Sequence, residues 1–302
     1  MHINLLALSL ALAIGLRVLP IGSRHPKPQH LKHPATTTHP LTLWRFALPP
    51  LLLLSTCMAI VIMGRPGSMW GMPVHDWGFV CALGFLGVAL RRLVQAGIQL
   101  WQTQQILLGC GPLPGTVATQ AGYLLPSAGL FAGQVGWWRS RLVLSQGVLE
   151  TFGPEQVAAI VAHEQAHSYY QDPFWFFWLG WLRSIAPGLP GTDRLWQELL
   201  LRREQRADAW AAQTVDPLLL AETLVAFVQR ASQTALPTDP SVLAAFSDAV
   251  PLHRLEERVE ALLQAPDRPV APARSAFPLN PLTLLGWLVA LLPLITIPFH
   301  HS

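Results

Sequence analysis

The chain has 302 residues, of which 51% are hydrophobic and only 12% are charged, and its formal net charge at pH 7 is +3. Because a soluble domain carries about 25% charged residues, this composition excludes a disordered tail, a nucleic-acid-binding arm and an ordinary cytosolic enzyme. Asp76 is the only acidic residue before Glu150. Any chemistry that needs carboxylates must therefore lie in the second half of the chain.

Four apolar segments are long enough to cross a hydrocarbon core of about 30 Å. They are residues 3–21, 43–63, 70–90 and 281–298, and the third begins near Trp70 or Trp77. A cleaved signal peptide is the alternative for the first segment, which lacks a basic start and a clear small-residue cleavage site after Leu16. Arg91 and Arg92 follow the third segment and mark its boundary with water. The sequence therefore predicts a multi-pass membrane protein.

The loop between the first two segments, residues 22–42, is rich in proline and histidine and carries Arg24, Lys27 and Lys32. The next loop has only Arg65. Because short cytosolic loops are enriched in Lys and Arg, this asymmetry predicts a cytosolic first loop and an N-terminus outside the plasma (inner) membrane. The region after the third segment is then cytosolic as well. For the loop itself, a stiff solvated linker is the first interpretation and a weak histidine metal site the second.

One motif carries specific chemistry: residues 163–167 read His-Glu-Gln-Ala-His. They lie in a helix that is predicted to begin at Pro154, because proline suits the first helical position. His163 and His167 face the same side of this helix and can bind one Zn²⁺. Glu164 stands where it can take a proton from a water molecule that attacks a carbonyl group. A solvated helix with two histidines is the alternative.

A catalytic zinc site needs a third protein ligand and leaves the fourth position open. Glu204 is the first candidate, since Asp208 lies four residues further on the same predicted helix and both can face the histidines. Glu204 would bind the metal, and Asp208 would hold a ligand imidazole by its second nitrogen. Glu198 is a rival ligand without an acidic partner, and a charged surface helix is the alternative for the whole segment.

Residues 174–190 are apolar and rich in tryptophan, but a full crossing there would place His163 and Glu204 on opposite sides of the membrane. The segment is short, contains Arg183 and ends in Pro-Gly-Leu-Pro-Gly. We therefore expect an interfacial or re-entrant helix near the bilayer surface. The predicted organisation is a membrane region over residues 1–100, a catalytic domain over 101–275 and a C-terminal span within 276–302.

Residues 141–150 (RLVLSQGVLE) and 153–167 (GPEQVAAIVAHEQAH), followed by Asp172-Pro173, resemble the core of membrane-embedded gluzincin peptidases. The resemblance covers roughly residues 100–265. It implies a mainly α-helical membrane protein with a zincin-like α+β catalytic domain, in which the motif helix accompanies a small antiparallel sheet.

The resemblance also implies roles for individual residues. One zinc ion per chain would be bound by His163, His167 and Glu204, with Glu164 as the catalytic base and Asp208 as the acid behind a ligand. An edge strand that pairs with an extended substrate would comprise Leu142, Val143 and Leu144. Residues 255–262 resemble a late helix of these families that contains an arginine, here Arg258, to which no catalytic role is assigned; a surface amphipathic helix is the alternative. The candidates for stabilising the oxyanion are Tyr169, Tyr170 and His253.

Two neighbouring families share this core: the bacterial beta-lactam-sensor antirepressor peptidases, and the heat-shock and prenyl-protein (CAAX) proteases. Three spans before the motif and a short aromatic segment before the third ligand favour the sensor-type family. The run at residues 207–212 is closer to the heat-shock type, which usually has two full spans between the histidines and the glutamate. No beta-lactam-binding domain follows the last span in this sequence, so a peptidase module without drug sensing is expected.

The sequence therefore predicts a zinc metalloendopeptidase that cleaves membrane-associated or regulatory proteins. The expected partners are a protein or peptide substrate and the lipid bilayer, without nucleic acid, and no oligomeric state is predicted. A non-catalytic signalling or scaffold protein that keeps a zinc site is the alternative, which the intact Glu164 disfavours. A metal transporter is disfavoured because the predicted spans contain almost no ionisable residues.

Overall fold

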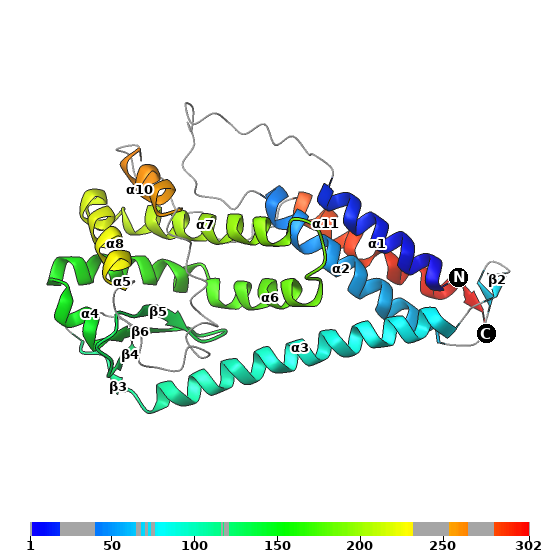
Figure 1. Cartoon of the computed structure of the whole chain (residues 1–302), viewed down its shortest axis with the longest axis horizontal. Coiled ribbons are helices and arrows are strands. Elements are labelled where there is room, and N and C mark those ends of the chain that lie inside the picture. Colours follow the sequence, from blue (N-terminus) through cyan, green and yellow to red (C-terminus); the bar gives the residue numbers. More distant parts are fainter. Residues whose placement is uncertain are drawn as a thin grey trace.

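The computed structural model describes residues 2–18, 40–64, 68–69, 72–73, 76–115, 117, 121–231, 254–264 and 281–301. Figure 1 shows two parts at opposite ends of the molecule. A bundle of apolar helices holds both ends of the chain, and a lobe of helices around a small sheet holds its middle. The bundle and the lobe are joined by one long helix.

The bundle consists of α1 (His2–Val18), α2 (Pro40–Met63), α11 (Pro281–Leu291) and the 3₁₀ helix η3 (Leu292–Phe299). α2 is its central helix, since Cys57, Ile60 and Met63 form a buried cluster that apolar side chains of α1 and η3 cover. At the outer end of the bundle lie three short strands in the order β2-β1-β7. They are β1 (Ser68–Met69), β2 (Met72–Pro73) and β7 (His300–His301).

The long connecting helix is α3 (Asp76–Leu108). It begins at Asp76, beside the later of the two predicted starts of the third span, because Met72 and Pro73 pair with β1 and Asp76 occupies the first helical turn. It also continues as a helix far beyond Arg91 and Arg92, which were predicted to mark the lipid boundary of the span, since leucine, alanine and glutamine favour a helix there. The helix therefore does not end at residue 90, and the lipid boundary expected there stays a prediction.

Two helices are long and apolar enough to cross a membrane, namely Leu41–Met63 within α2 and the whole of α3. α1 and residues Leu285–Pro298 are apolar but shorter, so the predicted four-span topology stays a prediction. Large apolar side chains of α3 lie on the surface, among them Trp77, Leu90 and Trp101, each at least 60% exposed. Exposed apolar surface of this kind is typical of contact with lipid or protein, as in a membrane-associated protein.

The lobe contains a four-stranded sheet in the order β3-β4-β6-β5. Its strands are β3 (Gly111–Pro112), β4 (Gly122–Leu125), β5 (Ala132–Val135) and β6 (Arg141–Ser145). The expectation of an antiparallel sheet is wrong for one pair, because β4 and β6 run parallel. After β4 the chain forms β5 at the outer edge of the sheet. It then returns and forms β6 between β4 and β5.

The expectation that residues 142–144 form an edge strand is also wrong. Leu142, Val143 and Leu144 lie on β6, which pairs with β4 on one side and with β5 on the other. All three side chains are buried, as is typical of an apolar central strand. Within the described residues, the open edge on this side of the sheet belongs to β5. That strand is followed by Gly136, whose φ of 133° favours glycine.

Helices pack on this sheet and on one another in the rest of the lobe. They are α4 (Gln146–Thr151), α5 (Pro154–Tyr169), α6 (Asp172–Ile185), α7 (Thr192–Ala211), α8 (Pro217–Ala231) and α10 (Leu255–Leu263). α5 begins at Pro154, as predicted, with Gly153 as its N-cap residue. Apolar side chains of α5, among them Val157 and Ile160, pack against the buried face of β6.

α6 and α7 form a helical hairpin whose tip lies against the bundle and α3 (Figure 1). The turn between Ile185 and Thr192 reverses the chain, so α7 returns toward α5. Trp181 Nε1 donates a 2.9 Å hydrogen bond to the carbonyl oxygen of Ala89 on α3. Residues 174–190 therefore contact apolar helices without separating α5 from α7, while their position at a bilayer surface stays a prediction.

Candidate metal centre

The residues singled out in the sequence lie on two helices that pack directly against each other. The His-Glu-Gln-Ala-His motif lies on α5, and Glu204 and Asp208 lie on α7. Ala166 of α5 and Ala207 of α7 are fully buried in one apolar cluster between the helices. Because alanine has a small side chain, the two helices come close enough for their functional side chains to meet.

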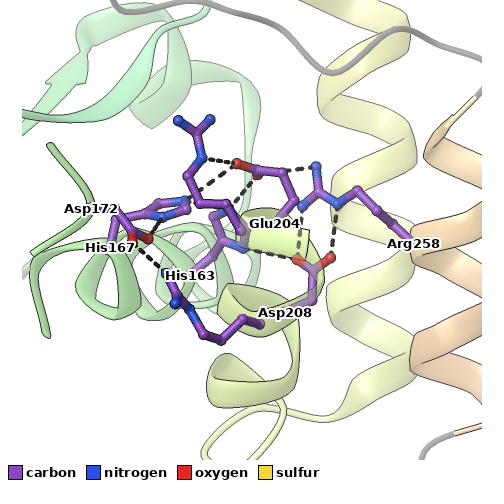
Figure 2. A network of polar contacts seen from close by, with 8 residues as sticks. His163, His167, Asp172, Glu204, Asp208 and Arg258 are labelled. Atoms are coloured by element: carbon purple, nitrogen blue, oxygen red, sulfur yellow. Dashed lines mark hydrogen bonds and ion pairs between the residues drawn. The ribbon is translucent and has the colours of Figure 1, made fainter. Parts of the chain in front are cut away.

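Three ligand atoms converge between α5 and α7 (Figure 2). His163 Nε2 lies 3.2 Å from His167 Nε2 and 3.3 Å from Glu204 Oε2, and His167 Nε2 lies 3.8 Å from Glu204 Oε1. A tetrahedral zinc ion bound at about 2.0–2.1 Å separates neighbouring ligand atoms by about 3.3 Å, so these spacings fit it. The three side chains are buried and form a group that could hold a metal ion.

Asp208 lies behind His163, on the side away from the point of convergence. Its Oδ1 is 2.9 Å from His163 Nδ1, and Arg258 of α10 donates two hydrogen bonds of 2.8 Å to the same carboxylate. A carboxylate at the second ring nitrogen holds the imidazole in place and leaves Nε2 for a metal. We call His163, Asp208 and Arg258 the Asp208 clamp.

His167 is held in a matching way. Its Nδ1 is 2.8 Å from Asp172 Oδ2, within hydrogen-bonding distance, and Arg206 forms an ion pair with the other oxygen of Asp172. The guanidinium carbon of Arg206 lies 4.1 Å from the centre of the Tyr170 ring, in a cation–π contact. We call His167, Asp172 and Arg206 the Asp172 clamp. Both imidazoles therefore turn Nε2 toward the same point (Figure 2).

Positive side chains surround the third predicted ligand. Arg203 Nε donates a 2.8 Å hydrogen bond to Glu204 Oε1, and Arg258 Nη1 lies 3.4 Å from Glu204 Oε2. Burial by itself would raise the pKa of Glu204, but Arg203, His167 and Arg258 lower that pKa well below its usual value. Glu204 is therefore ionised at neutral pH, which is the form that binds a metal cation.

The protonation of His163 depends on the two carboxylates near it. Burial by itself would lower the pKa of His163, but its contacts with Asp208 and Glu204 raise that pKa to about 10. The pKa of Asp208 is lowered, because the charge and hydrogen bonds of Arg258 outweigh the effect of burial. Since a metal ion binds only the neutral imidazole, metal binding would exchange this proton for the ion.

A cavity of about 870 Å³ lies beside the convergence point. Its walls include His163, His167 and Glu204, the strand β5, and residues of α3, α6 and α8. Glu164, which is 9% exposed, also lines this cavity. Glu164, the expected base, therefore lines the same cavity as the candidate ligands and as β5 with its open edge.

The other candidates from the sequence lie elsewhere. Glu198 pairs with an arginine four residues further on and is not part of the ligand group. Tyr169 is exposed, Tyr170 is buried beneath an arginine of α7, and neither lines the cavity. His253 and the histidines of the loop at 22–42 lie outside the described residues.

Several residues at the site carried weaker signals in the sequence. Asp172 entered there only through the resemblance, although its place before Pro173 at a helix start was visible. Arg258 was left without a role, yet it is buried against Asp208 and Glu204. The spacing of Arg258 could have indicated its burial, because Arg258 lies four residues before Leu262 and so on the same buried face of the helix.

The chain is similar to a known protein over part of its length. A curated protein of Variovorax paradoxus (strain S110), named Protease HtpX homolog, is 26% identical over 143 residues, which cover 39% of this chain and 49% of that protein. The chain thus spans about half the length of the curated relative it matches. No family model matches the chain. No solved structure matches it.

The partial match supports a peptidase. It also supports, in broad terms, a membrane zinc protease. It agrees with the family that the sequence placed second, the heat-shock type, while membership of the sensor-type family stays a prediction. The structure is mostly helical with a small mixed sheet and two candidate membrane helices, and a buried group of His163, His167 and Glu204 could hold a metal. At this level the chain is a protease-like, membrane-associated protein with a candidate metal centre.

Proposed function

We propose that the chain is a zinc-dependent membrane endopeptidase that hydrolyses peptide bonds of membrane-associated or regulatory proteins. The observation that carries this proposal is the buried group of His163, His167 and Glu204, which shares a cavity with Glu164. The partial likeness to a protease supports it. A heat-shock or CAAX-type quality-control protease is compatible with the same observations.

The chemistry follows from the positions of the side chains. His163, His167 and Glu204 would hold one zinc ion, which when bound polarises the scissile carbonyl group and lowers the pKa of a water molecule. Glu164 accepts the proton of the attacking water and passes it to the leaving amine. Arg203 and Arg258 line the same cavity, and their positive charge would favour the negative charge that develops on the carbonyl oxygen.

The cavity also suggests where a substrate binds. β5 has an open edge within the described residues, and an extended peptide can add to such an edge through backbone hydrogen bonds. The cavity wall also includes Arg92, Gln95 and Gln99 of α3, the helix that is also a candidate membrane span. A peptide in the cavity would therefore lie next to a membrane helix, which supports a membrane-associated substrate.

The proposal includes the topology expected from the sequence. The catalytic lobe would face the cytosol at the plasma (inner) membrane, with the N-terminus outside and the α6 segment at the bilayer surface. The distribution of Lys and Arg in the predicted loops supports this orientation. Fusing a reporter that is active only in the cytosol to the region after α8 would test it, because an external lobe would leave such a reporter silent.

Glu164→Gln separates metal binding from catalysis. We expect the purified, detergent-solubilised variant to retain one zinc ion per chain, because the ligands are unchanged, and to lose at least about 100-fold of the cleavage rate. Zinc would be measured by elemental analysis, and cleavage by mass spectrometry on a proteome-derived peptide library.

The matched control is Glu155→Gln, at the exposed start of the same helix, which should cleave like the unchanged protein. A zinc-loaded, unchanged protein that cleaves no peptide would favour the non-catalytic scaffold. Equal cleavage by the Glu164→Gln variant would show that Glu164 is not the base.

A further inference from the structure

Gln134 on β5 has a side chain that lies in the cavity wall without a partner. It is only 8% exposed, and it lines the cavity beside the candidate metal centre. Neither its amide nitrogen nor its amide oxygen has a hydrogen-bond partner among the described residues. An unsatisfied buried amide is costly, so native proteins normally provide such a group with a partner.

The strand pairing shows which way Gln134 faces. The backbone N–H of Ser145 donates to the carbonyl oxygen of Phe131, and hydrogen-bonded pairs alternate along an antiparallel ladder. The backbone groups of Gln134, three residues after Phe131, therefore point away from β6, toward the open edge. Its side chain lies on the same sheet face as that of its register partner Leu142, which packs with residues of α5.

Gln134 therefore offers polar groups in two directions. Its backbone N–H and C=O face the open edge, and its side-chain amide lies on the face of the sheet that is covered by the motif helix. A primary amide donates and accepts hydrogen bonds at the same time, which matches the N–H and C=O of a peptide group. An ordered water molecule is the other partner that fits a single donor and acceptor.

We propose that the side-chain amide of Gln134 binds a peptide group of the substrate next to the scissile bond and positions the extended chain along β5. This assignment rests on the proposed peptidase function. In this assignment Gln134 orients the bound substrate before the reaction, whereas Glu164 takes a proton from the attacking water.

The test uses the zinc-loaded, full-length protein and three hydroxamates that share one chelating group. Acetohydroxamate carries no further peptide group, acetyl-Leu-Leu-NHOH extends to the amino-terminal side of the chelator, and a malonyl hydroxamate of Leu-Leu-amide extends to the other side. Affinities are measured by thermal-shift titration. Gln134→Met keeps the length of the side chain but removes both hydrogen-bonding groups, and Gln104→Met on the exposed surface of α3 is the matched control.

We expect Gln134→Met to weaken at least one peptidyl hydroxamate about tenfold, and to change acetohydroxamate by less than about twofold. An equal loss for all three probes would mean a structural role and would overturn the assignment. Unchanged affinities for both peptidyl probes would also overturn it, and would identify water as the partner of the amide. Failure of the unchanged protein to bind acetohydroxamate would instead count against the zinc site, and so against the proposed function.

A second variant covers the case in which Gln134→Met folds poorly. Gln134→Glu keeps the size and shape of the side chain and replaces the N–H donor by an acceptor. It should produce the same selective loss for a peptidyl probe, and a loss confined to acetohydroxamate would contradict the assignment.

Discussion

The two imidazoles of the candidate metal centre are held by the same chemistry but by different parts of the chain. The Asp172 clamp joins α5, α6 and α7, because Asp172 follows His167 by five residues and Arg206 of α7 pairs with Asp172. The Asp208 clamp needs α10, which supplies Arg258 from 50 residues further along the chain. One half of the site is therefore held by the consecutive helices α5, α6 and α7, whereas the other half also depends on the docking of the more distant α10.

The clamps also differ in what they reach. Arg206 contacts Asp172 and the ring of Tyr170, so its effect is confined to one imidazole. Arg258 contacts both Asp208 and a carboxylate oxygen of Glu204. Loss of the Asp208 clamp should therefore disturb two of the three candidate ligands, and loss of the Asp172 clamp only one.

The largest expected difference comes from Asp208→Ala compared with Asp172→Ala. Asp208→Ala should weaken zinc binding about 100-fold, because the released Arg258 can then compete with the metal for Glu204, whereas Asp172→Ala should weaken it about tenfold. Each variant leaves a buried arginine without its main partner, so each should lose about 3 kcal/mol of stability. Competition with a chromophoric chelator measures the affinities, and thermal unfolding measures the stabilities.

The control for both variants is Asp193→Ala. Asp193 forms an ion pair with Arg183 near the start of α7, but its side chain is 84% exposed. Such a surface pair contributes less than about 1 kcal/mol, so zinc affinity should not change. If Asp172→Ala weakened zinc binding as much as Asp208→Ala, the two clamps would be equivalent and the comparison would be wrong.

A smaller effect is expected when the docking of α10 is weakened at a distance from the metal. Leu262→Ala removes a side chain that is 4% exposed and packs in the cluster formed with α5, α7 and α8. It should lose about 2–4 kcal/mol of stability, and zinc affinity should fall up to about tenfold because Arg258 lies on the same helix. Thermal unfolding and zinc competition would show both changes.

The neighbouring substitution Leu263→Ala is its control, since Leu263 is 60% exposed. It should leave stability and zinc affinity within about 0.5 kcal/mol of the unchanged protein. A stability loss in Leu262→Ala without any change in zinc affinity would show that α10 does not contribute to the Asp208 clamp.

The smallest effect on stability and zinc affinity is expected at Tyr170, whose ring contacts Arg206 of the Asp172 clamp. Tyr170→Leu keeps an apolar side chain beneath Arg206 but removes the aromatic face, which contributes about 1–2 kcal/mol in a desolvated cation–π contact. Zinc affinity should fall only a few-fold, since the ion pair of Arg206 with Asp172 remains. Tyr169→Leu, at an exposed neighbouring position, should change neither quantity, and a larger loss there than at Tyr170 would contradict this assignment.

The elements of the fold that could be predicted are those with local signals. The mainly apolar run at residues 43–63 corresponds to α2, and the Gly153-Pro154 pair gives the start of α5. The sheet order could not be predicted, because the parallel pairing of β4 with β6 is non-local and has no signature within either strand. The length of α3 could not be predicted, because Arg91 and Arg92 indicate where a membrane span meets water, whereas the end of a helix depends on backbone propensity.

The candidate site divides in the same way. The four-residue spacings of the two histidines, and of Glu204 with Asp208, are helical and so were visible in the sequence. The role of Gln134 depends on which strand lies at the edge, and the role of Arg258 on where α10 packs. These relations arise only when distant segments meet, so residue spacing alone could not reveal them.

The continuity of α3 has a consequence for which bonds could be cut. Its 33 residues span about 50 Å, and Arg92, the first of its residues in the cavity wall, lies about 24 Å along the axis from Asp76. If the first part of α3 crosses the bilayer, one unbroken helix fixes the height of the cavity above the hydrocarbon core. Cleavage would then be selected by the distance of a peptide bond from the membrane surface, and less by the side chains on either side of it.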